Sequence, residues 1–143
     1  MAGTTTYNAA YFAGLRIDKH QGHSSFFARY PKGRDATLDY PGIDVKFTNT
    51  FGSSIKIFYN WGLDWIAVMI YGNKESTGVL NVTASPPNPV QFNNCELTNV
   101  IRTVTKRDGS KAIGEKDFYE KKKKRNKTNK QTHCSPNFIF FAK

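Results

Sequence analysis

Alternation of apolar and polar residues in the middle of the chain constrains the fold more than any other feature. Every second residue of IDVKFT is apolar, which places Ile43, Val45 and Phe47 on one face of a half-buried strand. Residues 55–60 alternate in the same way, and the turn-forming sequence NTFGSS separates the two stretches. The pattern therefore predicts a β-hairpin over residues 43–60.

The longest apolar run, residues 65–71, predicts a central strand. It has seven residues and is followed by a Gly-Asn pair, which is typical of a strand covered on both faces. It is far shorter than the roughly 18 residues that a membrane-spanning helix requires. We expect the core to be drawn from these strands, with the following members: Ile43, Val45, Phe47, Ile55, Ile57, Trp65, Val68 and Ile70.

Three later segments predict further strands, namely TGVLNVTA, NPVQF and CELTNVIRTVTK, and the closing NFIFFAK is expected to be tied into a sheet. Only two segments have helical features. TTTYNAAYFAGL has apolar residues at four-residue spacing and Gly14 near its end. GEKDFYEKKKKRNK, residues 114–127, has acidic residues early and basic residues late, which suits the helix dipole.

Together these signals predict a mostly β fold. The closely spaced strands favour a single-domain antiparallel β-sandwich, jelly-roll-like, with at most one or two short helices. We expect one domain over residues 1–143, with a basic segment at about 115–133 that could be disordered.

Positive charge is concentrated in one part of the chain. Residues 102–130 contain twelve basic and four acidic residues, whereas residues 1–101 contain eight basic and seven acidic ones. A dedicated nucleic-acid fold usually spreads its cationic side chains over several elements, so this distribution argues against a basic groove across the whole fold. The residues predicted to bind polyanions are those of the run itself: Lys121, Lys122, Lys123, Lys124, Arg125, Lys127 and Lys130.

Exposed aromatic and basic side chains supply a second set of binding residues. An aromatic ring on a rigid strand can stack on a sugar or a base, and Phe58 must face away from the buried side of its alternating strand. The turn ARYPKGRD adds cationic groups beside a tyrosine. The predicted ligand-binding residues are Phe58, Trp61, Arg29, Tyr30 and Arg34.

Catalytic and metal-binding patterns are sparse, so we predict no catalytic residue, no metal and no cofactor. His20 and His23 could supply two metal ligands but need a third, which His133 could provide. A small ribonuclease using these histidines with Arg29 is an alternative. The aspartates Asp35, Asp39, Asp44 and Asp64 are expected to cap turns or face solvent.

One segment resembles a known family. VKFTNTFGSSIKIFYNWG, residues 45–62, is similar to a segment in the small A component of Pir-type binary insecticidal toxins. The residues that carry the resemblance are Val45, Asn49, Thr50, Ile57, Tyr59, Trp61 and Gly62. The resemblance implies a jelly-roll-like sandwich, a glycan-binding role and a larger partner protein. The long basic insertion departs from the family, and no functional residue is carried over.

Two functional hypotheses follow. The first is a non-enzymatic recognition module, a toxin component or secreted effector, that binds a glycan or an anionic membrane surface. The second is a nucleic-acid-binding protein, of viral type, whose basic run contacts phosphates and could direct it to a host nucleus. The nearly neutral body favours the first, and with it a secreted location.

Overall fold

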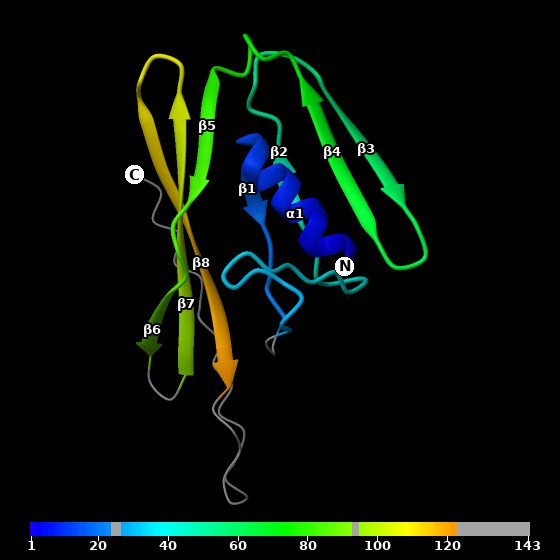
Figure 1. The fold of residues 1–143 in the computed structure, drawn as a ribbon, viewed down its shortest axis with the longest axis vertical. Helices are drawn as coiled ribbons and strands as arrows, with labels where there is room; N and C mark the ends of the chain where they lie inside the picture. The colour runs from blue at the N-terminus through cyan, green and yellow to red at the C-terminus, as the bar shows by residue number, and fades with distance from the viewer. Residues whose placement is uncertain (24–26, 93–94, 123–143) are drawn as a thin grey trace, which may run out of the picture.

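The computed structural model describes residues 1–23, 27–92 and 95–122 (Figure 1). Strands supply most of its regular structure, which confirms the predicted mostly β fold class. In chain order, the elements are α1 (Ala2–Ala13), β1 (Arg16–Lys19), β2 (Lys46–Thr48), β3 (Ile55–Trp61), β4 (Ile66–Gly72), β5 (Val79–Ala84), β6 (Asn88–Phe92), β7 (Cys95–Lys106) and β8 (Lys111–Lys122).

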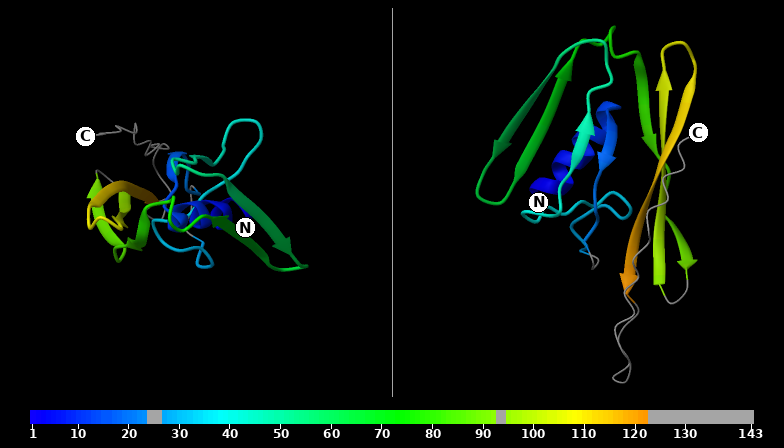
Figure 2. Two further views of the ribbon diagram at one scale, coloured as in Figure 1. Left: turned by 90° about the horizontal axis from the view of Figure 1, so that it is seen from above. Right: turned by 180° about the vertical axis from the view of Figure 1, so that it is seen from behind.

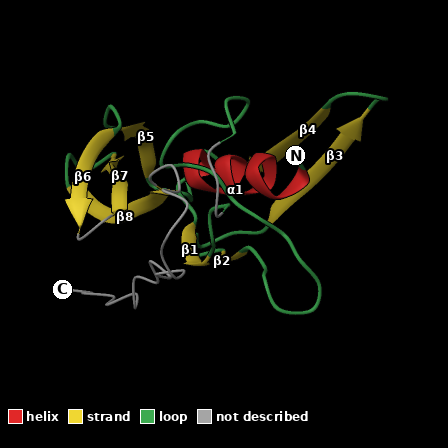
Figure 3. Cartoon of the chain, turned by 90° about the horizontal axis from the view of Figure 1, so that it is seen from below, coloured by secondary structure: helices red, strands yellow, loops and turns green. Residues whose placement is uncertain are grey.

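The described strands form three separate antiparallel sheets. β1 pairs with β2, β3 pairs with β4, and the largest sheet has the order β5-β7-β6 with β8 also paired to β7. Figure 3 shows the helix α1 lying between these sheets. The sandwich arrangement is not confirmed, because the strands do not gather into two facing sheets in the part of the chain that the structure describes.

The core is built around α1. Its buried residues recur at helical spacing, so Thr4, Tyr7 and Tyr11 lie on one face of the helix, and both tyrosines are fully buried. Leu15 and Ile17 extend this core into β1. The helix ends because Gly14 adopts a left-handed conformation, with φ of 84°, and its backbone N–H returns to the last turn.

The largest sheet is anchored to this core through a buried arginine of β7. The Arg102 Nη2 atom donates to the backbone oxygen of Leu15 at 2.9 Å, and the guanidinium lies 4.8 Å from the centre of the Tyr11 ring. The cationic group thus satisfies a carbonyl at the end of the helix while packing on an aromatic face. No helix in the described part of the chain is both long and apolar enough to span a bilayer.

One predicted strand pairing and one predicted strand position are wrong. Residues 43–60 do not form a hairpin, because β2 pairs with β1 from far earlier in the chain and β3 pairs with β4. β4 is not a central strand covered on both faces, since it belongs to a two-stranded sheet in which Met69 and Tyr71 are exposed. Local alternation identifies strands but does not determine which strands pair.

The predicted core is only partly correct. Val45, Phe47, Ile55 and Ile70 pack against the core, whereas Ile57 and Trp65 are exposed and the helix supplies the centre of the core.

The first predicted helix is confirmed by α1. The second predicted helix, residues 114–127, is wrong for the described part, residues 114–122. This part belongs to β8, which pairs with β7 along its length, so tertiary pairing overrides helical propensity. NFIFFAK lies outside the described residues.

Candidate functional site

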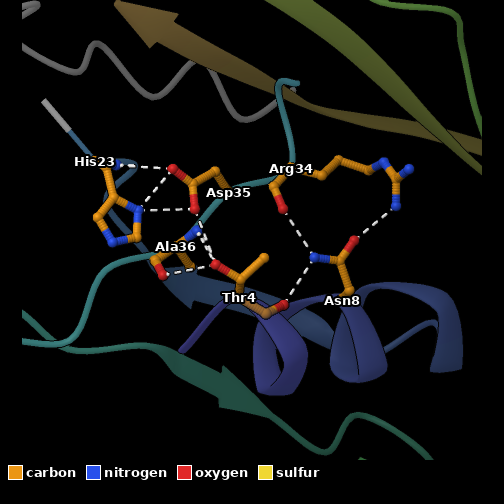
Figure 4. Close-up of polar contacts among 6 residues, drawn as sticks. All are labelled: Thr4, Asn8, His23, Arg34, Asp35 and Ala36. Atoms are coloured by element: carbon orange, nitrogen blue, oxygen red, sulfur yellow. Dashed lines mark hydrogen bonds and ion pairs between the residues drawn. The ribbon is translucent and has the colours of Figure 1, made fainter. Parts of the chain in front are cut away.

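A buried carboxylate joins the start of α1 to the segment around residues 23–36. Asp35 is only 4% exposed and accepts a hydrogen bond from the Thr4 hydroxyl at 2.9 Å (Figure 4). The same hydroxyl contacts the backbone of Ala36, which fixes the segment against the helix. A buried carboxylate needs several donors to offset the loss of water, and His23 supplies the others.

His23 binds Asp35 through both its backbone and its ring. The backbone N–H donates to Asp35 Oδ2 at 3.1 Å, and ring Nδ1 lies 2.7 Å from the same oxygen. Because a carboxylate only accepts hydrogen bonds, Nδ1 carries the hydrogen, and in the neutral ring Nε2 is an acceptor. Nε2 makes no hydrogen bond among the described residues. The pair therefore holds Nε2 in a defined orientation on a ring that is partly exposed.

A second group of hydrogen bonds, centred on Asn8, holds Arg34 against the helix. The Asn8 side-chain amide donates to the backbone oxygens of Thr4 and Arg34, at 2.7 and 2.8 Å. In return, Arg34 Nη1 donates to Asn8 Oδ1 at 2.6 Å, and the guanidinium lies 5.0 Å from the centre of the Phe12 ring. The loop and the helix thus orient Arg34 across the helix surface (Figure 4).

Aromatic rings and a second cationic group lie on the same loop. His23 stacks on Tyr30 with ring centres 5.1 Å apart and planes at 14°, and Phe27 meets His23 edge-on. The exposed Arg29 guanidinium lies 5.6 Å from the Tyr30 ring centre and 6.0 Å from that of Phe27. A shallow depression of about 510 Å³ separates this loop from α1, lined by residues that include Thr5, Asn8, Phe12, Arg29, Tyr30 and Val68.

The electrostatic character of this site is cationic at its surface. Its one carboxylate, Asp35, is buried and committed to His23 and Thr4. Neither Arg29 nor Arg34 forms an ion pair with any described residue. We call the set His23, Phe27, Arg29, Tyr30 and Arg34 the loop site. It can stack on an apolar face, accept a hydrogen bond at Nε2 and bind an anion.

Of the predicted ligand-binding residues, Arg29 lies beside Tyr30, whereas the Arg34 guanidinium lies against Phe12 of α1. Phe58 and Trp61 lie on β3 outside this site, and they point to opposite faces of the strand because three positions separate them. Phe58 meets Tyr71 edge-on, with ring centres 5.5 Å apart, so these aromatics do not form the single platform that the sequence suggested.

The predicted histidine ligands and the basic run do not belong to the loop site. His20 stacks on Tyr7, with ring centres 4.2 Å apart, and no group of three metal-ligating side chains forms among residues 1–23, 27–92 and 95–122. His133 lies outside the described residues. In the basic run, Lys121 and Lys122 end β8, and the rest of the run also lies outside the described residues.

Sequence reasoning missed Thr4, Asn8 and Asp35. The prediction that Asp35 caps a turn or faces solvent is wrong, because it is buried and bonded to residues 12 and 31 positions away. Nothing in GRDAT distinguishes this aspartate from an exposed one. The helical pattern could have flagged Thr4, which shares its face with Tyr7 and Tyr11.

Part of the chain matches a known protein family. Residues 1–71 match a family model described as VanW like protein. This VanW-like segment runs from α1 into β4 and contains every residue of the loop site together with Thr4, Asn8 and Asp35. No curated protein and no solved structure matches the chain.

The VanW-like match overturns the resemblance to Pir-type toxins. Residues 45–62, which carried that resemblance, lie inside the matched segment, and the family is a different one. The prediction of a toxin component or secreted effector is therefore wrong. The short strand-turn-strand pattern misled because such a pattern recurs wherever two strands follow one another.

Proposed function

We propose that this protein is a non-enzymatic recognition module that binds a glycan carrying carboxylate or phosphate groups, as found in anionic polymers at a cell surface. The observation that carries the proposal is the orientation of Arg29 and Arg34. Both guanidinium groups lie over aromatic rings and form no ion pair among the described residues. A planar guanidinium held in this way is suited to bidentate contact with a carboxylate or phosphate.

The rest of the loop site favours a sugar as the carrier of that anion. A sugar ring has C–H faces that pack on aromatic side chains, and Phe27 is exposed for such a contact. Sugar hydroxyls donate hydrogen bonds, and Nε2 of the neutral His23 ring is an oriented acceptor beside Phe27. Stacking, acceptor and cation are thus available within one loop.

We assign His23 a binding role rather than a catalytic one. An Asp-His pair can serve as a general base, but the base must reach a nucleophile or a proton on the substrate. Among the described residues, the hydrogen-bond and ring partners of His23 are Asp35, Phe27 and Tyr30, and the hydrogen bonds to Asp35 hold the ring in place. The pair therefore supports orientation of a ligand hydroxyl.

Binding of defined polymers to the full chain tests the proposal. Titration calorimetry with polygalacturonate should show binding that uncharged dextran does not. Arg29→Ala should weaken this binding roughly 10- to 100-fold, because a hydrogen bond to a charged group is worth about 1.5–3 kcal/mol. Arg107→Ala is the matched control, since it removes an exposed arginine from the turn between β7 and β8. It should change binding little.

The basic run provides the competing explanation. Replacement of Lys121, Lys122, Lys123, Lys124 and Arg125 with Ser should weaken binding to single-stranded nucleic acid or anionic vesicles if the run is what binds them. Under our proposal this variant retains binding to polygalacturonate. If it loses that binding while Arg29→Ala behaves like Arg107→Ala, the loop site is not the glycan site.

A further inference from the structure

The outer edge of β3 has no partner strand among the described residues. β3 pairs with β4 only, from Ile55 opposite Gly72 to Trp61 opposite Ile66. β4 lies on the side of this hairpin toward α1, and β3 lies on its outer side (Figures 1 and 2). The outer backbone N–H and C=O groups of β3 are therefore available to pair with a further strand.

Apart from one lysine, this edge lacks the features that usually prevent strands from associating. β3 has seven residues, IKIFYNW, with no proline, no glycine and a single charge, at Lys56. Phe58, Tyr59 and Trp61 are 49%, 48% and 70% exposed. Natural proteins commonly protect an exposed edge with lysines, prolines or bulges, and β3 is paired without a bulge along its whole length.

We propose that this edge pairs with the β3 edge of a second copy of the chain, antiparallel and about a two-fold axis at Phe58. Phe58 is the middle residue of β3, so this register pairs the whole strand. It places Phe58 opposite its symmetry mate, Ile57 opposite Tyr59 and Lys56 opposite Asn60. No like charges face one another, and residues of similar character meet on each face.

The same register accounts for the exposure of Trp61. Side chains of directly opposed residues lie on the same face of a sheet, so Trp61 of one copy lies beside Ile55 of the other. Ile55 and Ile70 pack against the core, which identifies this face as the core side of the hairpin. Each copy thus contributes a tryptophan that covers the exposed margin of its partner's core.

Disulfide trapping tests the register. In the full chain carrying Cys95→Ser and Cys134→Ser, Phe58→Cys should form an intermolecular disulfide on mild oxidation, because directly opposed Cα atoms lie about 4.5–5.5 Å apart. Lys56→Cys is the matched control. Its symmetry mate lies four residues along the strand, roughly 13 Å away, so it should not cross-link. Equal cross-linking of the two variants would overturn the proposed register.

Sedimentation equilibrium tests the association itself. The parent chain should be dimeric, and Phe58→Lys should weaken the dimer about tenfold or more, because it places two lysines directly opposite each other. Leu80→Lys, at a residue of β5 that is 65% exposed, is the control and should leave the dimer intact. A monomeric parent chain, or a Phe58→Lys variant that stays dimeric, would overturn the proposal. If Phe58→Lys does not fold, the cysteine variants decide.

Discussion

Replacing Gly33 with alanine should destabilise the protein strongly, because this glycine is constrained in two ways. Its φ of +72° lies in the left-handed region that alanine adopts at a cost of about 1–2 kcal/mol. A Cβ atom there would lie 2.3 Å from Cγ2 of Val100, which is 1% exposed on β7. Such overpacking costs about 1–3 kcal/mol, so the expected loss is roughly 2–5 kcal/mol.

Gly109 provides the matched control. Its φ of +83° carries the same backbone strain, but an added Cβ would meet no atom within 4 Å. Gly109→Ala should therefore lose only the backbone contribution, about 1–2 kcal/mol. The difference between the two variants isolates the packing of the loop that carries Arg34 and Asp35 against β7.

Urea unfolding followed by circular dichroism measures both losses. Val100→Ala removes the clashing methyl groups, so it should cost less in the Gly33→Ala background than in the parent, with a coupling of about 0.5–3 kcal/mol. If Gly33→Ala is no less stable than Gly109→Ala, the close contact between this loop and β7 does not exist in solution.

Two further predictions concern the hydrogen-bonded aspartates. Asp35→Ala removes the acceptor of the His23 backbone, the His23 ring and Thr4, and should lower the free energy of unfolding in urea by about 2–4 kcal/mol. Asp39→Ala, at an exposed residue, is the control and should change it by less than about 0.5 kcal/mol. Equal effects of the two variants would contradict the burial of Asp35. The pKa of Asp18 lies below its ordinary value of 3.8, first because the Thr48 hydroxyl donates to it and then because of Arg16. Its contribution to stability is therefore present above pH 3.8 and is lost as the pH falls through the lowered pKa. Thr48→Val should raise this pKa in an NMR titration of the carboxyl groups while that of Asp108 stays unchanged, and an unaltered Asp18 titration would exclude the hydrogen bond as its cause.

The sequence by itself predicted the segments that contain β2 to β7 and where the helix ends, but not β1 or β8. CELTNVIRTVTK coincides with β7, and the shorter predicted segments contain β5 and β6, because β-branched residues and turn signals act locally. Gly14 ends α1 for an equally local reason, since glycine adopts the left-handed conformation without steric cost. The sequence also showed that Arg29, Tyr30 and Arg34 share one turn, because neighbours in the chain are adjacent without any tertiary information, and their role in binding stays a prediction.

Only the tertiary structure decided which strands pair and which polar residues meet. β2 pairs with β1 across more than twenty intervening residues, and alternation alone does not encode that partner. The segment 114–122 has helical propensity, yet it extends along β7 because a long antiparallel ladder contributes more than propensity does. Asp35 is buried because Thr4 and His23, both distant in sequence, supply its donors. A residue's environment depends on the whole fold, and sequence neighbours specify only the part of it that is local.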